Sequence, residues 1–426
     1  MLVPVMFLAM VVMICINVPI GVSLAIAAII GLIATEGMSS LVVIALDMYG
    51  GATNFALIAI PMFVLAGAIM NASGITIRLI NFISALIGFV RGGLAMVNIG
   101  VSLFFAEISG SAVADVAALG SILIPEMKRR GYSAPFAAAV TSSSASLAII
   151  IPPSIPMILY AVSAETSVEQ LFVAGFIPGL LGGMGLMGVA YIFARRYDFP
   201  VEETFNIKRV KETFVEALPT FLLPAIIIGG IFSGFVTATE AAGLAVLAAL
   251  LIGIYYREID FRHLKKAMLD GGMQTAVVMI LVAASVVMGG FLTRAQIPQQ
   301  LALQMLEITQ SKYLILLILN VFFLVIGFFL HSAAAIILVV PIVVPLIQQF
   351  GIDPIHFGLV VTLNLAIGQQ TPPVASVLIT ACSIARANIW EVSRVNIFFI
   401  AVLLAVLIIC TYVPAIPMFL VDFFYR

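Results

Sequence analysis

Long apolar stretches joined by short polar connections make up almost the whole chain. A run of about 17 to 25 apolar residues crosses the hydrocarbon core of a bilayer as a helix, and a helix pairs its own backbone polar groups inside lipid. The pattern therefore predicts an all-α polytopic membrane protein with about ten crossings. The predicted spans cover residues 2–34 as two helices broken around Asn17 to Gly21, then 54–72, 132–163, 171–194, 213–232, 238–256, 269–292, 354–386 and 395–420.

Two more segments, near residues 93–127 and 314–349, are apolar but carry polar residues at their centres. Polar groups in the middle of a membrane helix are costly, so each segment is predicted to turn back as a re-entrant helical hairpin. We expect the two tips at Ser109 to Ser111 and at Gly327 to Ser332.

Composition supports a membrane protein and argues against other classes. The chain is 63% hydrophobic and only 9% charged, whereas soluble domains are about a quarter charged. Its net charge of −1 gives no reason to expect a nucleic-acid partner. Cys15, Cys382 and Cys410 all lie in apolar runs, which argues against a disulfide framework or a metal cluster. The first charged residue is Glu36, so no cleavable signal peptide is expected.

Lysine and arginine predict the orientation of the spans. If both termini are periplasmic, only Arg294, Lys312 and Arg426 of the 19 basic residues lie outside, and all the others become cytoplasmic. Short cytoplasmic loops retain Lys and Arg, so this orientation is preferred over its inverse. The first hairpin would then enter from the cytoplasm and the second from the opposite side.

A shift of 220 residues lays the second half of the chain on the first. It pairs Pro125 with Pro345, and Pro152-Pro153 with Pro372-Pro373. Because the charge pattern gives the halves opposite orientations, we interpret them as an inverted-topology repeat, an architecture that many secondary transporters share. The alternative is that the repeated prolines only kink two long helices, since Pro is frequent in transmembrane helices.

Each repeat contains a hairpin followed by a helix that is broken at its Pro-Pro pair. We expect the remaining helices, mainly residues 1–72 and 213–256, to form a scaffold. The predicted ranges are 1–212 for the first repeat, with its hairpin at about 93–127 and its broken helix at 132–163, and 213–426 for the second, with its hairpin at about 314–349 and its broken helix at 354–386.

The broken helices predict ion-binding chemistry. Proline lacks a donor and displaces the carbonyl four residues before it, so the two pairs should release the carbonyls of Ala148, Ile149, Gly368 and Gln369. Such carbonyls must face protein, a cavity or an ion at membrane depth, and sodium is well served by neutral oxygens. Half-helix N-termini at the same place suit a substrate carboxylate.

Polar side chains near the tips and breaks are candidates for a substrate cavity, and each has a structural alternative. Asp115 follows the first tip, where it could instead stabilise the N-terminus of a helix. Ser144 and Asn364 are repeat partners that could line a cavity or join helices by hydrogen bonds. Ser111 completes the predicted cavity, although small residues also let helices pack closely. Weaker candidates are Glu107, Glu240 and His331, the last of which favours a structural role.

Two long segments carry a resemblance to a known family. SGSAVADVAALGSILIPEMKRRGY from Ser109, followed by FAAAVTSSSASLAIIIPPSIPMILYA from Phe136, resembles the large membrane subunit of TRAP (tripartite ATP-independent periplasmic) transporters, the DctM-like family. NVPIGVSLA near Asn17, TATEAAGLAV near Thr237 and QQTPPVASVL near Gln369 extend the resemblance over essentially the whole chain.

The resemblance implies an elevator-type transporter in the bacterial inner membrane, coupled to Na⁺ and without another cofactor. It also implies two partners, a small TRAP membrane subunit and a periplasmic substrate-binding protein, and an organic anion with a carboxylate as substrate. The chain looks closest to sialic-acid-type members. C4-dicarboxylate transport and a sodium/anion symporter that needs no binding protein are the alternatives.

The resemblance also implies two sodium sites. The first would use Ser109, Ser111 and the backbone around Ala148, Ile151 and Pro153. The second would use Gly327, Gly368, Thr371 and Pro373. Position 148 is often glycine in the family. The residues between Gly230 and Thr237 also depart from its usual motif, which leaves the role of Thr237 open.

An enzyme is the rival from another class. The chain has no Walker A loop, no HExxH zinc motif and no GxSxG nucleophile elbow. Its three histidines form no cluster with carboxylates near a nucleophile in the sequence. We therefore expect a transporter and not an enzyme.

Overall fold

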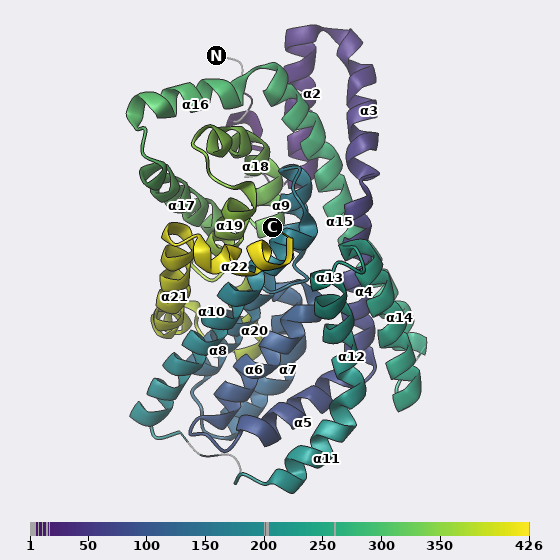
Figure 1. Cartoon of the computed structure of the whole chain (residues 1–426), viewed down its shortest axis with the longest axis vertical. Coiled ribbons are helices and arrows are strands. Elements are labelled where there is room, and N and C mark those ends of the chain that lie inside the picture. Colours follow the sequence, from purple (N-terminus) through teal and green to yellow (C-terminus); the bar gives the residue numbers. More distant parts are fainter. Residues whose placement is uncertain are drawn as a thin grey trace.

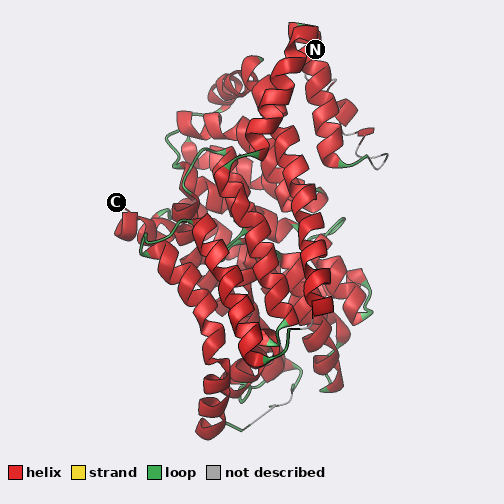
Figure 2. Cartoon of the chain, turned by 90° about the vertical axis from the view of Figure 1, so that its right-hand side faces the viewer, coloured by secondary structure: helices red, strands yellow, loops and turns green. Residues whose placement is uncertain are grey.

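The structure is a computed structural model of the chain, and every regular element that it describes is a helix (Figure 2). It describes residues 6, 8–10, 12–13, 16, 18–199, 201, 204–259 and 261–425, without the side chains of residues 107–109, 263, 267, 270, 274, 301–302 and 308. The all-α fold that the apolar pattern predicts is confirmed. Of the break predicted around Asn17 to Gly21, Asn17 lies outside the described residues, Val18 and Pro19 are not helical, and helix α2 (Ile20–Glu36) begins directly after Pro19.

One group of long helices lies along one side of the molecule (Figure 1). Helix α15 (Phe261–Arg294) packs against α2, α3 (Leu41–Ala52) and α4 (Ala59–Ala72), and α14 (Ala238–Tyr256) packs against α4. Small side chains let α14 approach closely, because Ala241, Ala242, Ala245 and Ala249 are all fully buried. The predicted scaffold ranges thus contain helices that do pack together.

The other helices form two helical hairpins and two interrupted helices. The first hairpin is α6 (Gly93–Ser109) and α7 (Ala112–Arg129), and the second is α17 (Lys312–Phe329) and α18 (Ser332–Gln349). Helix α8 (Ala134–Ala145) and α9 (Ile155–Ser163) flank the first break, while α19 (Pro354–Gly368) and α20 (Ser376–Ala385) flank the second. Helices α10 (Val168–Arg196) and α21 (Ile389–Tyr412) pack beside the interrupted helices.

Eight helices among the described residues are long and apolar enough to cross a membrane. Both arms of the second hairpin are among them, so the predicted number of crossings stays a prediction. The predicted span 395–420 is wrong in its bounds, because α21 ends at Tyr412 and α22 (Ala415–Tyr425) leaves at an angle to it (Figure 1). Pro414 explains the turn, because proline disfavours a helical residue before it and lacks a donor.

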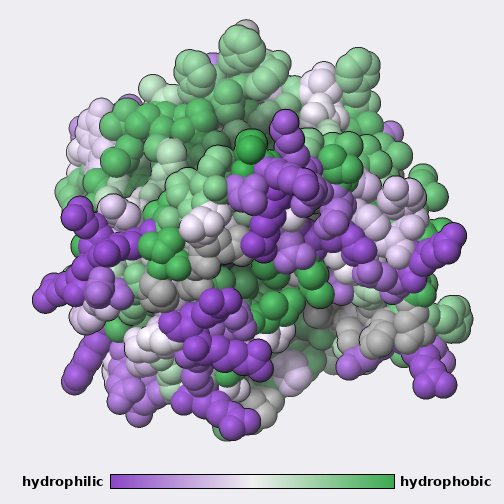
Figure 3. Space-filling view, turned by 90° about the horizontal axis from the view of Figure 1, so that it is seen from below, coloured by the Kyte–Doolittle hydropathy of each residue, from purple (hydrophilic) through white to green (hydrophobic). Residues whose placement is uncertain are grey.

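Short helices escaped the search for long apolar runs. One of them is α5 (Ile75–Ile87), which packs against α11 (Ile207–Ala217) at one end of the molecule (Figure 1). Arg78 of α5 donates two hydrogen bonds to Glu258 and lies 3.8 Å from the centre of the Tyr256 ring. These hydrogen bonds hold the pKa of Glu258 below its usual range. The view from below shows many hydrophilic side chains at this end of the molecule (Figure 3).

Candidate ion and substrate site at two helix breaks

The first break is closed by local hydrogen bonds and buried completely. After α8 the chain makes a 3-10 turn over Ser146–Ile149, passes the cis Pro152-Pro153 bond and starts α9 at Ile155. The Ser154 hydroxyl accepts from the Met157 N–H (3.3 Å) and donates to the Ile149 carbonyl (2.7 Å). Ser154 therefore caps the new helix and also pairs a carbonyl that proline removed from the helix.

The tip of the first hairpin touches this break. The Ile155 N–H donates to the Gly110 carbonyl (3.4 Å). Gly110 has a φ of +61°, and an added Cβ would lie 2.9 Å from the Pro153 carbonyl oxygen. Only glycine meets both demands without strain. The contact brings Ser111 next to the break, at the N-terminus of α7.

The second break repeats this arrangement with different residues. The Val374 N–H donates to the Phe328 carbonyl at the end of α17 (3.2 Å). Gly327 and Gly368 meet backbone to backbone, since a Cβ added at Gly368 would lie 2.5 Å from the Gly327 Cα. Each hairpin tip therefore contacts the broken helix of its own repeat.

The carbonyls predicted to be released find other donors. The Gly368 carbonyl accepts from the Thr371 N–H (2.9 Å) and the Gln369 carbonyl from the Val377 N–H (3.2 Å), while Ile149 is served by Ser154. The expectation of uncommitted carbonyls is therefore wrong for these three. A carbonyl oxygen has a second lone pair, so the same groups remain able to coordinate a cation.

The structure places the remaining sodium-site residues at or beside these breaks. Ala148 lies in the 3-10 turn, Ile151 is the second residue after that turn, and both are buried. The Thr371 hydroxyl donates to the Ile367 carbonyl (3.0 Å), and Pro373 is exposed. The side chain of Ser109 lies outside the described residues.

The candidate cavity residues separate into two groups. Asp115 is fully buried in the first turn of α7, beside the first tip. Ser144 lies 2.9 Å from the Ser102 hydroxyl of α6, and Asn364 donates to the Asn320 amide oxygen of α17 (2.7 Å). These hydrogen bonds join helices, which is the alternative reading of the Ser144 and Asn364 pair. Their place in a substrate cavity stays a prediction.

Two weaker candidates prove to cap helices. Thr237 and Glu240 form a capping box at the start of α14: the Glu240 N–H donates to the Thr237 hydroxyl (3.3 Å), and the Glu240 carboxylate accepts from the Thr237 N–H (2.9 Å). This gives Thr237 a local structural role. The His331 ring accepts from the Ala333 N–H (3.4 Å) at the start of α18, in keeping with the structural role favoured for it.

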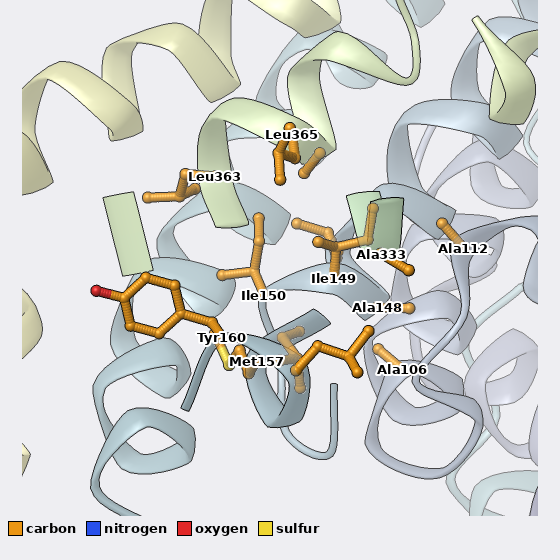
Figure 4. Packing of buried hydrophobic residues seen from close by; sticks show 14 of the residues in the cluster. Ala106, Ala112, Ala148, Ile149, Ile150, Met157, Tyr160, Ala333, Leu363 and Leu365 are labelled. Atoms are coloured by element: carbon orange, nitrogen blue, oxygen red, sulfur yellow. The ribbon is translucent and has the colours of Figure 1, made fainter. Parts of the chain in front are cut away.

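Contacts between the two repeats were not visible in the sequence. The Lys128 ammonium donates to the Ala385 carbonyl (2.8 Å), and the Tyr160 hydroxyl donates to the Pro354 carbonyl (2.7 Å). From the first of these contacts to the second, the residue number increases from Lys128 to Tyr160 in the first repeat and decreases from Ala385 to Pro354 in the second. The two interrupted helices therefore lie antiparallel. As a result, the first break faces the middle of α19, where Ile149 and Ile150 lie near Leu363 and Leu365 (Figure 4).

Ionisable ligands are scarce around the breaks. Among the described residues, no three His, Cys, Asp or Glu side chains gather in a way that could hold a metal ion. An ion at either break would therefore depend mainly on neutral carbonyl and hydroxyl oxygens.

Comparisons with known proteins agree on one family. The family model of the tripartite ATP-independent periplasmic transporter, DctM component, matches residues 7–416. The chain is 38% identical to the C4-dicarboxylate TRAP transporter large permease protein DctM of Pseudomonas aeruginosa, over 88% of each chain. It is 36% identical to the sialic acid TRAP transporter large permease protein SiaM of Vibrio cholerae, over 95% of each chain.

Two further comparisons extend this result. The chain is 38% identical to the isethionate TRAP transporter permease protein DctMQ of Oleidesulfovibrio alaskensis, over 98% of its own length but 66% of that protein. Its fold is similar to that of the YdaH transporter of Alcanivorax borkumensis, with a TM-score of 0.62 over 89% of this chain and 88% of the other. At 13% identity, this second likeness concerns the fold alone.

Proposed function

Because the chain belongs to the DctM component family of the tripartite ATP-independent periplasmic transporters, we propose that it is the large membrane subunit that carries a small organic anion inward with sodium. It is a multi-pass membrane protein and not an enzyme. Its place would be the bacterial inner membrane, with both termini periplasmic, as the distribution of lysine and arginine favours.

One observation carries the proposal. In both repeats a hairpin tip contacts a broken helix through a backbone hydrogen bond, Ile155 to Gly110 in one and Val374 to Phe328 in the other. Such junctions place carbonyl oxygens and half-helix N-termini together, which suits a cation beside an anionic substrate. Each half of the inverted repeat has one such junction, as alternating access requires. The tips and interrupted helices would move together as an elevator against the scaffold.

The two sodium sites would lie at these junctions. The first would be built from Ser109, Ser111 and the backbone of Ala148, Ile151 and Pro153, because the contact of Gly110 with Ile155 brings that tip to that break. The second would be built from Gly327, Gly368, Thr371 and Pro373. The close approach of Gly327 and Gly368 supports it directly. Ser111 and Asp115 would face the substrate.

The substrate would be an organic anion delivered by a periplasmic binding protein, and a small membrane subunit would complete the transporter. The names of the similar proteins include C4-dicarboxylate, sialic acid and isethionate, which are all organic anions. Sialic acid is the first candidate and a C4-dicarboxylate the second, and identities of 36% and 38% do not separate them.

Uptake into proteoliposomes tests the proposal. The chain would be reconstituted with its small subunit and given sialic acid, C4-dicarboxylate or isethionate together with the matching binding protein, with and without an inward sodium gradient. We expect uptake of one substrate that needs both sodium and its binding protein. Uptake that needs neither would show a conventional symporter or a channel.

A pair of matched threonines tests the second sodium site. Thr371 and Thr380 both donate to the carbonyl four residues earlier, but only Thr371 lies in the break. Thr371→Ala should raise the half-saturating sodium concentration more than it lowers the yield of folded protein, and Thr380→Ala should leave it unchanged. Equal effects of the two variants would contradict a ligand role for Thr371. Ser109→Ala provides the same test for the first site.

A further inference from the structure

A buried polar cluster that none of the predicted sites includes joins the two repeats. It consists of Ser143 in α8, Gln370 in the break just after α19 and Asn396 in α21, and all three are fully buried. The Ser143 hydroxyl lies 2.7 Å from Gln370 Oε1 and 2.6 Å from Asn396 Oδ1. Asn396 Nδ2 lies 3.3 Å from Gln370 Oε1 and 3.5 Å from the Gln370 carbonyl oxygen.

The three side chains of the cluster are hydrogen-bond partners of one another. Gln370 Oε1 accepts from Asn396 Nδ2 and lies within hydrogen-bond distance of the Ser143 hydroxyl, and Gln370 Nε2 donates to the Ala366 carbonyl (3.5 Å). A hydroxyl carries one proton, so Ser143 donates to one of its two acceptors at a time. Loss of any member leaves another buried polar group without its partner, which costs about 1–3 kcal/mol. The three side chains therefore hold one another in place.

The position of the cluster gives it access to both breaks. Gln370 directly precedes Thr371, and the N–H groups of these two residues donate to the Ile367 and Gly368 carbonyls (3.1 and 2.9 Å). A shift of Gln370 would thus move Thr371 and the Gly368 carbonyl. Ser143 lies on the opposite element, in the helix that leads through a single 3-10 turn to the first break.

The antiparallel arrangement determines which residues of the two repeats meet. Between the outer contacts, Lys128 with Ala385 and Tyr160 with Pro354, the pair Ser143 and Gln370 lies near the middle of the packed segments. The second break consequently faces the serine-rich part of α8, whereas the first break faces leucines of α19. Polar contact between a break and the other repeat is seen at Gln370.

We propose that Ser143, Gln370 and Asn396 couple the two sodium sites, so that sodium bound at one break raises the affinity at the other. Ser143 and Asn396 act as positioning residues and do not touch the ion. Sodium at the second break fixes Thr371 and Gln370, and the hydrogen bonds pass this order to α8 and the first break. The coupling rests on the proposed sodium-dependent function.

Sodium titration of transport tests the coupling with a matched pair of serines. Ser142 is also fully buried, but among the described residues its hydroxyl donates only to the Ala139 carbonyl in its own helix (3.1 Å). Ser143→Ala should lower the Hill coefficient for sodium toward one and raise the half-saturating sodium concentration about 5-fold or more, in the usual range of allosteric coupling. Ser142→Ala should keep both values of the wild-type protein.

Rescue and a second variant separate positioning from folding. Ser143→Thr keeps the hydroxyl and should restore cooperativity. If Ser143→Ala does not fold, Asn396→Ser tests the same cluster from α21, because its shorter side chain no longer reaches Gln370. A lower midpoint of thermal unfolding with an unchanged Hill coefficient in either variant would overturn the coupling and leave the proposed function intact. A wild-type protein without any response to sodium would overturn both.

Discussion

The two helix breaks share a sequence pattern but not an environment. Every residue from Ile150 to Ser154 in the first break is buried. In the second break Gln369 and Gln370 are buried, but Pro373 is exposed and Val374 is 44% exposed. Equivalent proline pairs therefore produce one sealed junction and one open junction.

The helix beside each break also differs between the repeats. Helix α10 carries Gly175 and Gly179, and a Cβ on either residue would collide with the Ile150 carbonyl oxygen or the Ile151 side chain. The same positions of the second repeat, 220 residues later, hold Val395 and Phe399 in α21. Glycine lets α10 approach the first break closely, whereas α21 carries larger side chains at the equivalent positions.

This inequality has a functional meaning under the proposed mechanism. An inverted repeat opens its halves in turn, so the two halves must differ in any single conformation. The repeat partners in the two breaks also differ in kind: Ala148 matches Gly368, Ser154 matches Val374, and Ile155 matches Ala375. Substitutions at these pairs test whether the two breaks are held by different contacts.

The largest effect is expected from Gly368→Ala. Its new methyl group would lie 2.5 Å from Gly327 Cα and 2.6 Å from the Gly327 carbonyl carbon, and backbone cannot move aside as a side chain does. We expect a loss of about 3 kcal/mol or more, the upper end for overpacking, together with a loss of transport. The midpoint of thermal unfolding and uptake measure both.

The reverse change at the repeat partner is the control. Ala148→Gly removes a methyl group from the first break and should cost only about 1 kcal/mol. If both variants lost the same stability, the close approach of the second hairpin would not distinguish the breaks.

A smaller effect is expected from Ser154→Ala. The change removes the N-cap of α9 and the donor to the buried Ile149 carbonyl. The cap is worth about 1 kcal/mol and an unpaired buried carbonyl about 1–3 kcal/mol, so we expect a loss of about 2 kcal/mol by thermal unfolding. Val374→Ala, at the equivalent and exposed position, should lose less. A greater loss for Val374→Ala would refute the contrast.

The smallest effect is expected from Ala375→Gly, and it should be stabilising. Ala375 has a φ of +44° at the start of α20, a conformation that costs an L-residue about 1–2 kcal/mol. Loss of one buried methyl group costs about 0.8 kcal/mol, so a gain of a few tenths of a kcal/mol should remain. Ile155→Gly, at the helical partner position, should lower the unfolding midpoint. Destabilisation by both changes would show that Ala375 is not strained.

The sequence by itself determined the class of the protein, the two hairpins and the two breaks. Long apolar runs, polar centres and Pro-Pro pairs act through local chemistry, because lipid demands paired backbone groups and proline withholds a donor. The sequence also placed Gly110 in the first predicted tip and Gly368 beside the second predicted break. The short amphipathic helix α5 was missed, since its apolar residues form no long run.

Only the tertiary structure decided how the repeats face each other. The contacts of Ser143 with Gln370 and of Tyr160 with Pro354 join residues about two hundred positions apart, and no local pattern encodes such a distance. The 220-residue repeat and the charge pattern predicted that equivalent helices run in opposite directions, but not which residues of the two interrupted helices meet. Partners for the released carbonyls and the sealing of one break depend on packing between distant helices, which local propensity does not determine.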